Sequence, residues 1–554
     1  MVDVHPPNPL LDLPPEILQQ ILFRLSVPDL LSTSRVCRHL NFNSNLDNLW
    51  SAHVKEQVPE YDLPDVLPSE IPSYRHLYLA HHPYWFLTRN RIWFCSDPYS
   101  GRLIVCKYNA ARQSIDGYRV VAQRSYVQST QWRYRPSVQI NHAEFQVSIS
   151  SDDPVLSLQP QLSTQSSGEI PHAGTGSWWK DSEIEMRVGR PEQKYYSSFF
   201  LSRDLPDETA ESPNVEVWPP RTIPGMPRVR ALSGDKFSGK GHKPQTLAQI
   251  SQTNFRTRQW PQWLQSIRQS IRTMGVTSAQ GTELTTWSTL DPRLYTPTKK
   301  RPYQGIFVGD YASHGCEFLL VMQSGSASES RGSAVADRRA NSVRAAIQAL
   351  REEEFTDVGD DIDDWNNVLA HLVGGALEMH QQDEDQAEDL ATTSVVSQII
   401  SPPSSAINER HESPVHPNIE DDEVHQGAIE AIKLTGDVNV PRGEHTWIAD
   451  DIGDAGLIRI ATEEPFRGAR VVRSRGHVAA QHFQNGKFAR PVFLDILESI
   501  TNGSLDQFIP SQLILVSPDV IAQYWLPFGH ISYYHRVDID ALLAEAGHRR
   551  RASE

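Results

Sequence analysis

The residue types that could perform nucleophilic chemistry meet at His314. Ser313 precedes this histidine and Cys316 follows two positions later, within the run GIFVGDYASHGCEFLL that begins at Gly305. A histidine activates a serine or a cysteine only when the side chains lie within hydrogen-bond reach. Side chains of adjacent strand residues point to opposite faces, which gives these groups poor geometry for catalysis. We therefore predict that the chain has no catalytic residue and is not an enzyme.

Residues that could bind a metal are also poorly spaced. His477 and His482 stand five positions apart, and the sequence offers no third ligand beside them. The 4 cysteines, none of which forms a C-x-x-C pair, are Cys37, Cys95, Cys106 and Cys316. Such sparse cysteines argue against a disulfide framework or a cysteine-built zinc site, and they favour a reducing compartment. We predict no metal and no cofactor.

A third polar cluster lies in LTGDVNVPRG, the stretch from Leu434 to Gly443. Asp437 and Asn439 carry short side chains of the kind that cap their own turn. The same side chains could instead contact a ligand, and the sequence leaves both interpretations open.

Charge and hydropathy limit the partners that the chain could bind. The net charge is −16, and the forty residues from Arg351 to Leu390 account for −13 of it, with fourteen Asp or Glu against one Arg. This acidic block and the near-neutral remainder do not suggest a nucleic-acid partner, which would need a basic face. No window reaches the roughly 18 apolar residues of a membrane span, and no leader is apparent. We expect a protein of the cytoplasm, the nucleus or both, with no membrane partner.

The elements that could position these residues begin with helices between Asn8 and Trp50. Pro14 and Pro15 open the first helix, where a missing N–H costs little. Pro28 starts a second helix, and a third carries Trp50. The apolar stripe of the first helix repeats at helical spacing: Ile17, Leu18, Ile21, Leu22 and Leu25. Such a small unit buries little apolar surface, so it is either a cap on a larger domain or a surface that a partner completes.

The order of residues in this segment resembles the F-box. The matching pieces follow one another in register: Leu13-Pro14-x-Glu16-Ile17-Leu18, Val27-Pro28-Asp29-Leu30, Ser34-Arg35-Val36-Cys37-Arg38 and Leu49-Trp50. The resemblance implies that this segment docks on the Skp adaptor of a ubiquitin ligase and, through the adaptor, on the cullin scaffold. The residues that it implies for the adaptor-binding face, or for its support, are Leu13, Pro14, Ile17, Leu18, Leu22, Leu30 and Val36. Asn41 and Phe42 depart from the family, which often carries a tryptophan there.

The region after the helices has the sequence pattern of an antiparallel β domain. Short β-rich runs alternate with Gly/Pro turns, from Pro83-Tyr84-Trp85-Phe86-Leu87 near the start to three runs between Leu513 and Val537. Many short strands with such turns predict a barrel or a sandwich, and a closed barrel leaves no exposed strand edge. One exception is Asn254–Met274, for which we predict a helix with Trp260 and Trp263 among the residues of its buried face.

An acidic segment rich in Ser and Pro divides this β region. Its composition favours disorder with short helices, for example over Ala334–Glu354. We predict that Glu317–Gln323 leaves a barrel and that Ala431–Asn439 re-enters it, which would bring Gly309–Glu317 close to Gly436–Gly443.

The predicted fold class is therefore α+β and multidomain, with a three-helix F-box, a mostly antiparallel β-barrel-like domain and a long, partly disordered acidic insertion. The predicted parts are an F-box (8–57), a helical linker (58–82), a β-rich substrate-binding domain in two pieces (83–323 and 428–545), the insertion (324–427) and a basic tail (546–554).

The motifs on both sides of the insertion resemble the C-terminal region of the F-box only protein 31 family. The positions that match are Gly315, Glu317, Gly436, Asp437, Asn439, Pro441 and Gly443, whereas Ala312 replaces a usual glycine. The resemblance implies a barrel that captures protein substrates through a degradation signal and directs them to ubiquitination and the proteasome. The residues taken as candidates for substrate binding are Asp310, His314, Thr435, Asp437 and Asn439. Two alternatives remain open: an F-box scaffold that acts outside a ligase, and a small-ligand-binding barrel.

Overall fold

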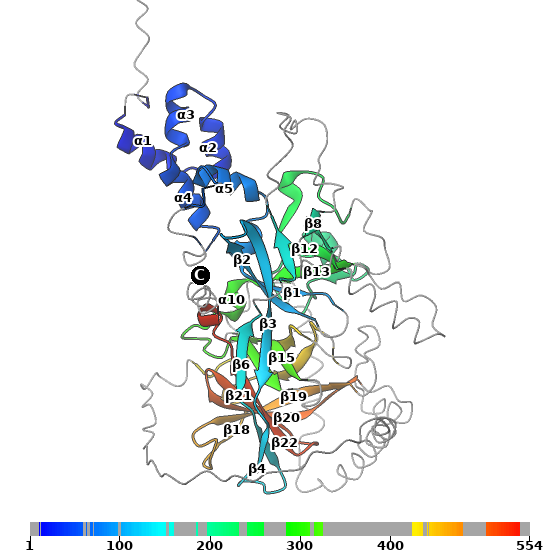
Figure 1. The fold of residues 1–554 in the computed structure, drawn as a ribbon. Coiled ribbons are helices and arrows are strands. Elements are labelled where there is room, and N and C mark those ends of the chain that lie inside the picture. Colours follow the sequence, from blue (N-terminus) through cyan, green and yellow to red (C-terminus); the bar gives the residue numbers. More distant parts are fainter. Residues whose placement is uncertain are drawn as a thin grey trace, which may run out of the picture.

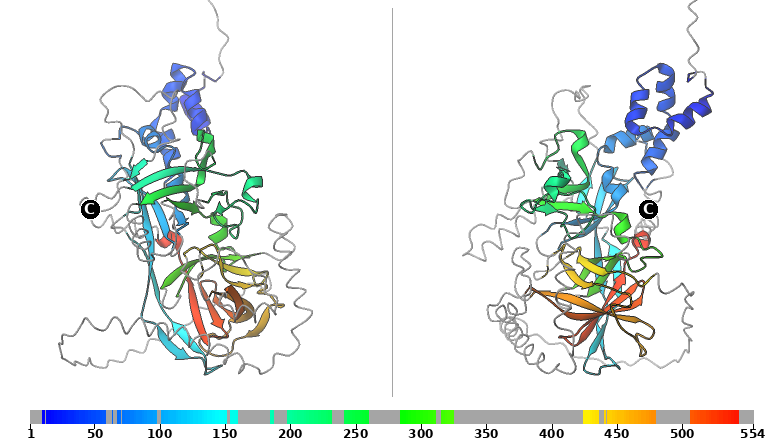
Figure 2. Two further views of the ribbon diagram at one scale, coloured as in Figure 1. Left: turned by 90° about the vertical axis from the view of Figure 1, so that its right-hand side faces the viewer. Right: turned by 180° about the vertical axis from the view of Figure 1, so that it is seen from behind.

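The computed structural model describes residues 10–11, 13–58, 63, 67–69, 71–97, 101–150, 154–159, 184–186, 197–231, 241–259, 284–310, 315–324, 424–435, 440, 442–479 and 506–542. Several predicted features lie outside these ranges: the helices of the insertion, residues 260–274 of the predicted helix, and the basic tail. Within the ranges, a helical unit lies at one end of the molecule, a first sheet in the middle and a barrel at the other end (Figures 1 and 2).

The helical unit has four short helices, and a fifth connects it to the first sheet. Their bounds are α1 Pro15–Leu22, α2 Val27–Thr33, α3 Arg38–Ser44, α4 Asp47–Lys55 and α5 Tyr74–His81. The predicted count of three is wrong because the second predicted helix is divided. Cys37 is extended, with φ −155° and ψ 167°, between α2 and α3. The Ser32 and Ser34 hydroxyls donate to the carbonyls of Pro28 and Leu31 at the end of α2, a habit of serine that favours helix ends.

The first sheet has nine strands, and its neighbouring strands pair antiparallel. Its strands are β1 Ile92–Cys95, β2 Leu103–Asn109, β3 Ser114–Arg124, β6 Phe145–Ile149, β7 Leu156–Leu158, β8 Ile184–Met186, β9 Ser197–Arg203, β12 Ile250–Gln259 and β13 Leu284–Thr289. The strand order is β6-β3-β2-β1-β13-β12-β9-β8, and β7 pairs with β3. The small elements around it are α6 Phe86–Asn90, α8 Asp207–Ala210, β10 Val217–Trp218, β11 Val229–Arg230 and η2 Leu247–Gln249.

Two predictions of local structure fail in this sheet. The aromatic run Pro83–Leu87 is not a strand but leads into α6. The predicted helix from Asn254 is strand β12 as far as Gln259, paired with β9 on one edge and β13 on the other. Both edges of β12 are therefore hydrogen-bonded, and this tertiary pairing overrides the local helical pattern.

The barrel is closed by eight strands. Its strands are β14 Gly305–Asp310, β15 Cys316–Gln323, β16 Ile429–Lys433, β17 His445–Ala449, β19 Arg470–Ala479, β20 Asp506–Ser517, β21 Val520–Trp525 and β22 His530–Arg536. They pair in this order, and β22 returns to β14 through the pairs Phe307–Arg536, Val308–His535 and Gly309–Tyr534. Attached to the barrel are β18 Leu457–Ile460, the hairpin of β4 Gln128–Gln131 and β5 Gln139–His142, and helix α10 Pro292–Tyr295. The predicted fold class, helices followed by an antiparallel barrel-containing region, is confirmed.

The predicted re-entry of the chain into the barrel is also confirmed. Strand β15, which precedes the insertion, pairs antiparallel with β16, which follows it, from Leu319–Lys433 to Gln323–Ile429. The Ser324 amide donates to the Ala428 carbonyl at 2.9 Å. The insertion thus leaves and returns between two adjacent strands, as the loop of a hairpin does.

The two sheets share one apolar core rather than forming independent bodies. Ile92, Phe94 and Leu103 from the first sheet pack in one cluster with Phe318 and Leu434 from the barrel. Trp218 and Ile223, from the connection around β10, complete the cluster. The single β-rich domain expected from the sequence is therefore built from two sheets, and its predicted outer boundaries stay predictions.

Candidate functional site

The helical unit presents an apolar face to solvent. Its interior holds Leu18, Leu22, Leu30, Leu40, Leu49 and Trp50. Ile17 keeps 43% of its surface exposed and Val36 keeps 71%, although both are branched apolar side chains. The other large apolar side chains exposed on this unit are Leu10, Ile21, Phe23 and Phe42. So many exposed apolar groups on so small a unit mark an interaction surface.

The residues predicted for adaptor binding divide into two groups. Leu18, Leu22 and Leu30 lie in the interior of the unit, with at most 2% exposed surface. Pro14, Ile17 and Val36 are exposed, and Leu13 is partly exposed. The first group can only support the face, whereas the second can contact a partner. Ile21, Phe23 and Phe42 were not predicted for the face, although Ile21 follows Ile17 at the i+4 spacing of a helix.

Helix α5 fixes the helical unit on the first sheet. The Tyr78 ring lies 5.7 Å from the Trp50 ring of α4 and 6.2 Å from the Trp85 ring next to α6. Trp85 Nε1 donates to the Tyr78 carbonyl at 2.8 Å, and the Tyr74 amide donates to the Asp47 carboxylate at 2.8 Å. The exposed apolar face is therefore held in a defined orientation to the rest of the chain.

The interior of the barrel differs between its two ends. Near the insertion it is filled with apolar side chains, among them Leu319, Val321, Ile429, Trp447 and Leu513. Alternate residues of a strand point to the same face, so the inward positions continue toward the other end. There they are mostly polar. We call this group the polar cup: Glu317, Lys433, Ser474, Ser511, Gln523 and Tyr534, all buried.

Hydrogen bonds and an ion pair connect the side chains of the polar cup. Lys433 Nζ lies 2.8 Å from Glu317 Oε2. Tyr534 donates through its hydroxyl to Gln523 Oε1 at 3.0 Å, and the hydroxyls of Ser474 and Ser511 lie 2.7 Å apart. Polar groups inside a barrel are costly to desolvate unless they are paired in this way. The cup is the end of the interior whose chemistry suits a polar ligand.

Two glycines in the wall of the cup admit large rings. A Cβ added to Gly309 would lie 2.3 Å from the Tyr534 ring, and one added to Gly476 would lie 2.3 Å from the Trp525 ring. Tyr534 and Trp525 fill the space that these glycines leave, and neither was among the residues predicted for the site.

Two of the candidate substrate-binding residues, Asp310 and Thr435, lie at the rim of the cup. Asp310 ends β14 and forms an ion pair with Arg124 of β3. Thr435 follows β16, and its hydroxyl accepts a hydrogen bond from the Phe318 amide at 2.9 Å, which extends the β15–β16 ladder. His314, Asp437 and Asn439 lie outside the described residues. Two of the five candidates are thus placed at one end of the barrel.

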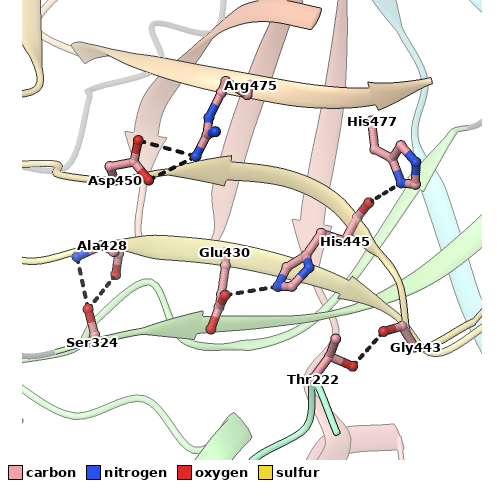
Figure 3. A network of polar contacts seen from close by, with 9 residues as sticks. All are labelled: Thr222, Ser324, Ala428, Glu430, Gly443, His445, Asp450, Arg475 and His477. Carbon is pink, nitrogen blue, oxygen red and sulfur yellow. Dashed lines mark hydrogen bonds and ion pairs between the residues drawn. The ribbon is translucent and has the colours of Figure 1, made fainter. Parts of the chain in front are cut away.

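A polar network covers the outer face of β16, β17 and β19 (Figure 3). His445 Nε2 lies 3.0 Å from the Glu430 carboxylate, and His477 Nδ1 donates to the His445 carbonyl at 2.9 Å. Arg475 donates to Asp450 at 3.1 Å. Figure 3 also shows Ser324 and Ala428, where the insertion begins and ends, far along the strands from Gly443. The insertion is therefore attached at the opposite end of the barrel from the cup.

Lys433, Gln523 and Arg124 were not among the residues predicted for the site. Lys433 was recognisable, because it stands in the apolar run Ala431-Ile432-Lys433-Leu434 and a charge in such a run needs a buried partner. Gln523 and Arg124 carry no comparable sequence signal, since they acquire their role only when distant strands meet.

The described part of the chain contains no group of three or more His, Cys, Asp or Glu side chains arranged to hold a metal ion. Among the same residues, no helix is both long and apolar enough to cross a membrane.

Comparison with protein families gives two matches, which lie on the two regions described above. Residues 10–55 match the family described as F-box-like. Residues 287–541, which include the whole barrel, match the Cyclin D1 binding domain. No curated protein matches the chain. The first match covers α1 to α4 and their exposed apolar side chains, so this segment of the chain is similar to the F-box-like family.

Proposed function

We propose that this protein is the substrate-recognition subunit of a cullin-type ubiquitin ligase. Its helical unit binds the Skp adaptor, and its barrel captures a protein substrate for ubiquitination and proteasomal degradation. The observation that carries the proposal is the set of exposed apolar side chains on the F-box-like unit. Ile17 of α1 and Val36 of the turn between α2 and α3 remain exposed although the interior of the unit is already filled. Such a receptor performs no covalent chemistry and acts by raising the local concentration of substrate near the ubiquitin-loaded enzyme.

Substrate capture is assigned to the polar cup and its rim. In support, the barrel matches a family whose description names cyclin D1 binding, which favours a protein ligand over a small molecule. The motifs that resemble the F-box only protein 31 family surround the same end of the barrel. Asp310 and Thr435 lie at this rim, and we include His314, Asp437 and Asn439 in the proposed binding site on the strength of that resemblance alone.

Binding of the purified full-length chain to a purified Skp adaptor tests the proposal. Ile17→Asp together with Val36→Asp places charges on the exposed face without entering the helical core. We expect adaptor binding to weaken by about thirtyfold or more, because two anchor side chains that contribute at least about 1 kcal/mol each total about 2 kcal/mol. Leu18→Asp would be unsuitable, because Leu18 is fully buried and its replacement would unfold the unit.

The matched control is Ile458→Asp together with Ile460→Asp on β18. These isoleucines are also exposed, by 40% and 47%, but lie on the barrel. The control should bind the adaptor like the wild type. Absence of an adaptor complex with the folded wild type would overturn the proposal. Adaptor binding without cullin recruitment or ubiquitin transfer would favour the alternative of a scaffold outside a ligase.

A further inference from the structure

Arg442 places a guanidinium in the seam between the first sheet and the barrel. This residue precedes Gly443 in the connection from β16 to β17. Its Nη2 donates to the Ser96 carbonyl at 2.6 Å, and its Cζ lies 5.8 Å from the centre of the Trp218 ring. Gly101 makes room for the side chain, because a Cβ at that position would lie 2.9 Å from Arg442 Cδ. The seam is thus shaped around this arginine.

Most of the donors of this guanidinium are not used within the described part of the protein. Arg442 Nε and Nη1 are buried and have no hydrogen-bond partner there. Burial lowers the pKa of the Arg442 guanidinium, and Cys95 and Asp97 oppose this shift only in part. The Asp97 carboxylate also lies 3.6 Å from Arg102. A buried charge with unused donors is costly, and an anion that accepts from the donors of Arg442 would offset this cost.

We propose that this seam binds one oxyanion, a carboxylate or a phosphate group, and that Arg442 is its principal ligand. A planar guanidinium suits both groups, because its N–H donors match the spacing of their oxygens. Arg442 keeps partial exposure as a residue, although its Nε and Nη1 atoms are themselves buried. The anion offsets the buried positive charge of Arg442, which has few hydrogen-bond partners within the described part of the protein.

The place of the seam indicates where the anion comes from. A Cβ built on Gly101, which borders Arg442, would lie 3.4 Å from Thr435 Cα at the rim of the cup. An acidic or phosphorylated residue of a protein held at the cup would therefore come close to Arg442. This choice of source rests on the proposed function, whereas the anion site itself does not.

Thermal unfolding of the full-length protein tests the site with inorganic phosphate and acetate, each compared with chloride at equal ionic strength. We expect one of these oxyanions to raise the Tm in a saturable manner, and Arg442→Gln to weaken its apparent affinity about tenfold or more. Arg467→Gln, which removes an exposed arginine of the barrel, should leave the affinity unchanged. If neither phosphate nor acetate raises the Tm of the wild type more than chloride does, the proposal is overturned. This outcome is measured on the wild type alone, so it holds even if Arg442→Gln does not fold.

A second arm identifies the source of the anion. Short peptides that differ only in one residue, glutamate, phosphoserine or serine, are titrated into the wild type and into Arg442→Lys. Tighter binding of the glutamate and phosphoserine peptides than of the serine peptide, reduced in Arg442→Lys, supports a protein source. Stabilisation by phosphate or acetate but by none of the peptides supports the site with a free anion. Adaptor binding measured on the same samples reports separately on the proposed function. Equal effects of all three peptides and all ions would contradict the site itself.

Discussion

At the scale of single residues, Gly443 shows how closely the two sheets approach. Its φ is +82°, in the region that favours glycine, and its carbonyl accepts a hydrogen bond from Thr222 of the connection around β10. A Cβ added there would lie 2.2 Å from Cγ of Pro220. The last glycine of LTGDVNVPRG is therefore needed both for the turn and for the contact between sheets.

Gly443→Ala should destabilise the protein by about 2–5 kcal/mol, from backbone strain of about 1–2 kcal/mol and overpacking of about 1–3 kcal/mol. Gly468→Ala is the matched control, because Gly468 has φ +84° and open space around its Cα. It should lose only the strain contribution. The measurement is the midpoint of urea unfolding, and equal losses in the two variants would show that the contact with Pro220 is unimportant.

His81 makes the packing of α5 sensitive to acid. Its side chain is buried at 2% exposure, between the Trp85 and Tyr108 rings, and burial lowers its pKa from 6.5 to about 4. Between these two values the unfolded chain binds a proton that the folded chain does not. The stability contribution is therefore complete above pH 6.5 and is lost as the pH falls toward 4.

Acidification from pH 7 to pH 5 should cost about 2 kcal/mol through His81. His81→Phe should remove that part of the pH dependence, whereas His39→Phe, at an exposed position of α3, should keep it. Urea midpoints at the two pH values measure the difference. Identical pH dependence in wild type and His81→Phe would contradict the assignment.

At the scale of elements, strands β15 and β16 are joined both by backbone hydrogen bonds and by a buried ion pair. The side chains of Lys433 and Glu317 keep only 1% and 6% exposure at their ion pair. Removal of one partner leaves the other charged and buried, which is worse than removal of both.

Lys433→Met should destabilise the protein by roughly 3–5 kcal/mol, and the double variant Lys433→Met with Glu317→Met should recover most of that loss. Calorimetric or urea unfolding of the two variants provides the comparison. A double variant less stable than the single one would mean that the pair contributes more than it costs to bury.

The same elements show how far the sequence predicts this structure. Strands β14 and β15 were predictable, because the strand–turn–strand pattern and the resemblance both marked Gly305–Leu320. Strand β16, Ile429–Lys433, was found only in part, because the predicted re-entry over Ala431–Asn439 covers its last three residues. Strand β12 was not, because its apolar spacing favoured a helix and only the two neighbouring strands decide the outcome. The polar cup was also hidden, since Gln523 and Ser511 lie on strands whose inward face is known only once the barrel closes.

At the scale of the whole molecule, the helical unit at one end and the barrel at the other are joined through the first sheet (Figure 1). The insertion leaves the barrel at the end opposite to the cup, between Ser324 and Ala428. It joins β15 and β16 at the ends of these strands that lie away from Glu317 and Lys433 of the cup.

Deletion of residues 325–423, with a short Gly-Ser connection in their place, should leave the fold intact. The adjacent strands β15 and β16 would then form an ordinary hairpin, and a shorter loop costs little closure entropy. The Tm and the Skp affinity of the deletion variant should equal those of the full chain within error. Loss of cooperative unfolding would show that the removed segment is part of the barrel core.

Protein turnover tests the central claim, that one chain couples adaptor binding to substrate capture. Half-lives across the proteome are compared between cells with the wild type and cells with Ile17→Asp/Val36→Asp, and proteins that co-purify with each form are identified. The account predicts that a defined set of proteins becomes longer-lived with the variant, and that the same set still co-purifies with it because the barrel is unchanged. Unchanged half-lives, or a stabilised set that does not co-purify, would contradict it.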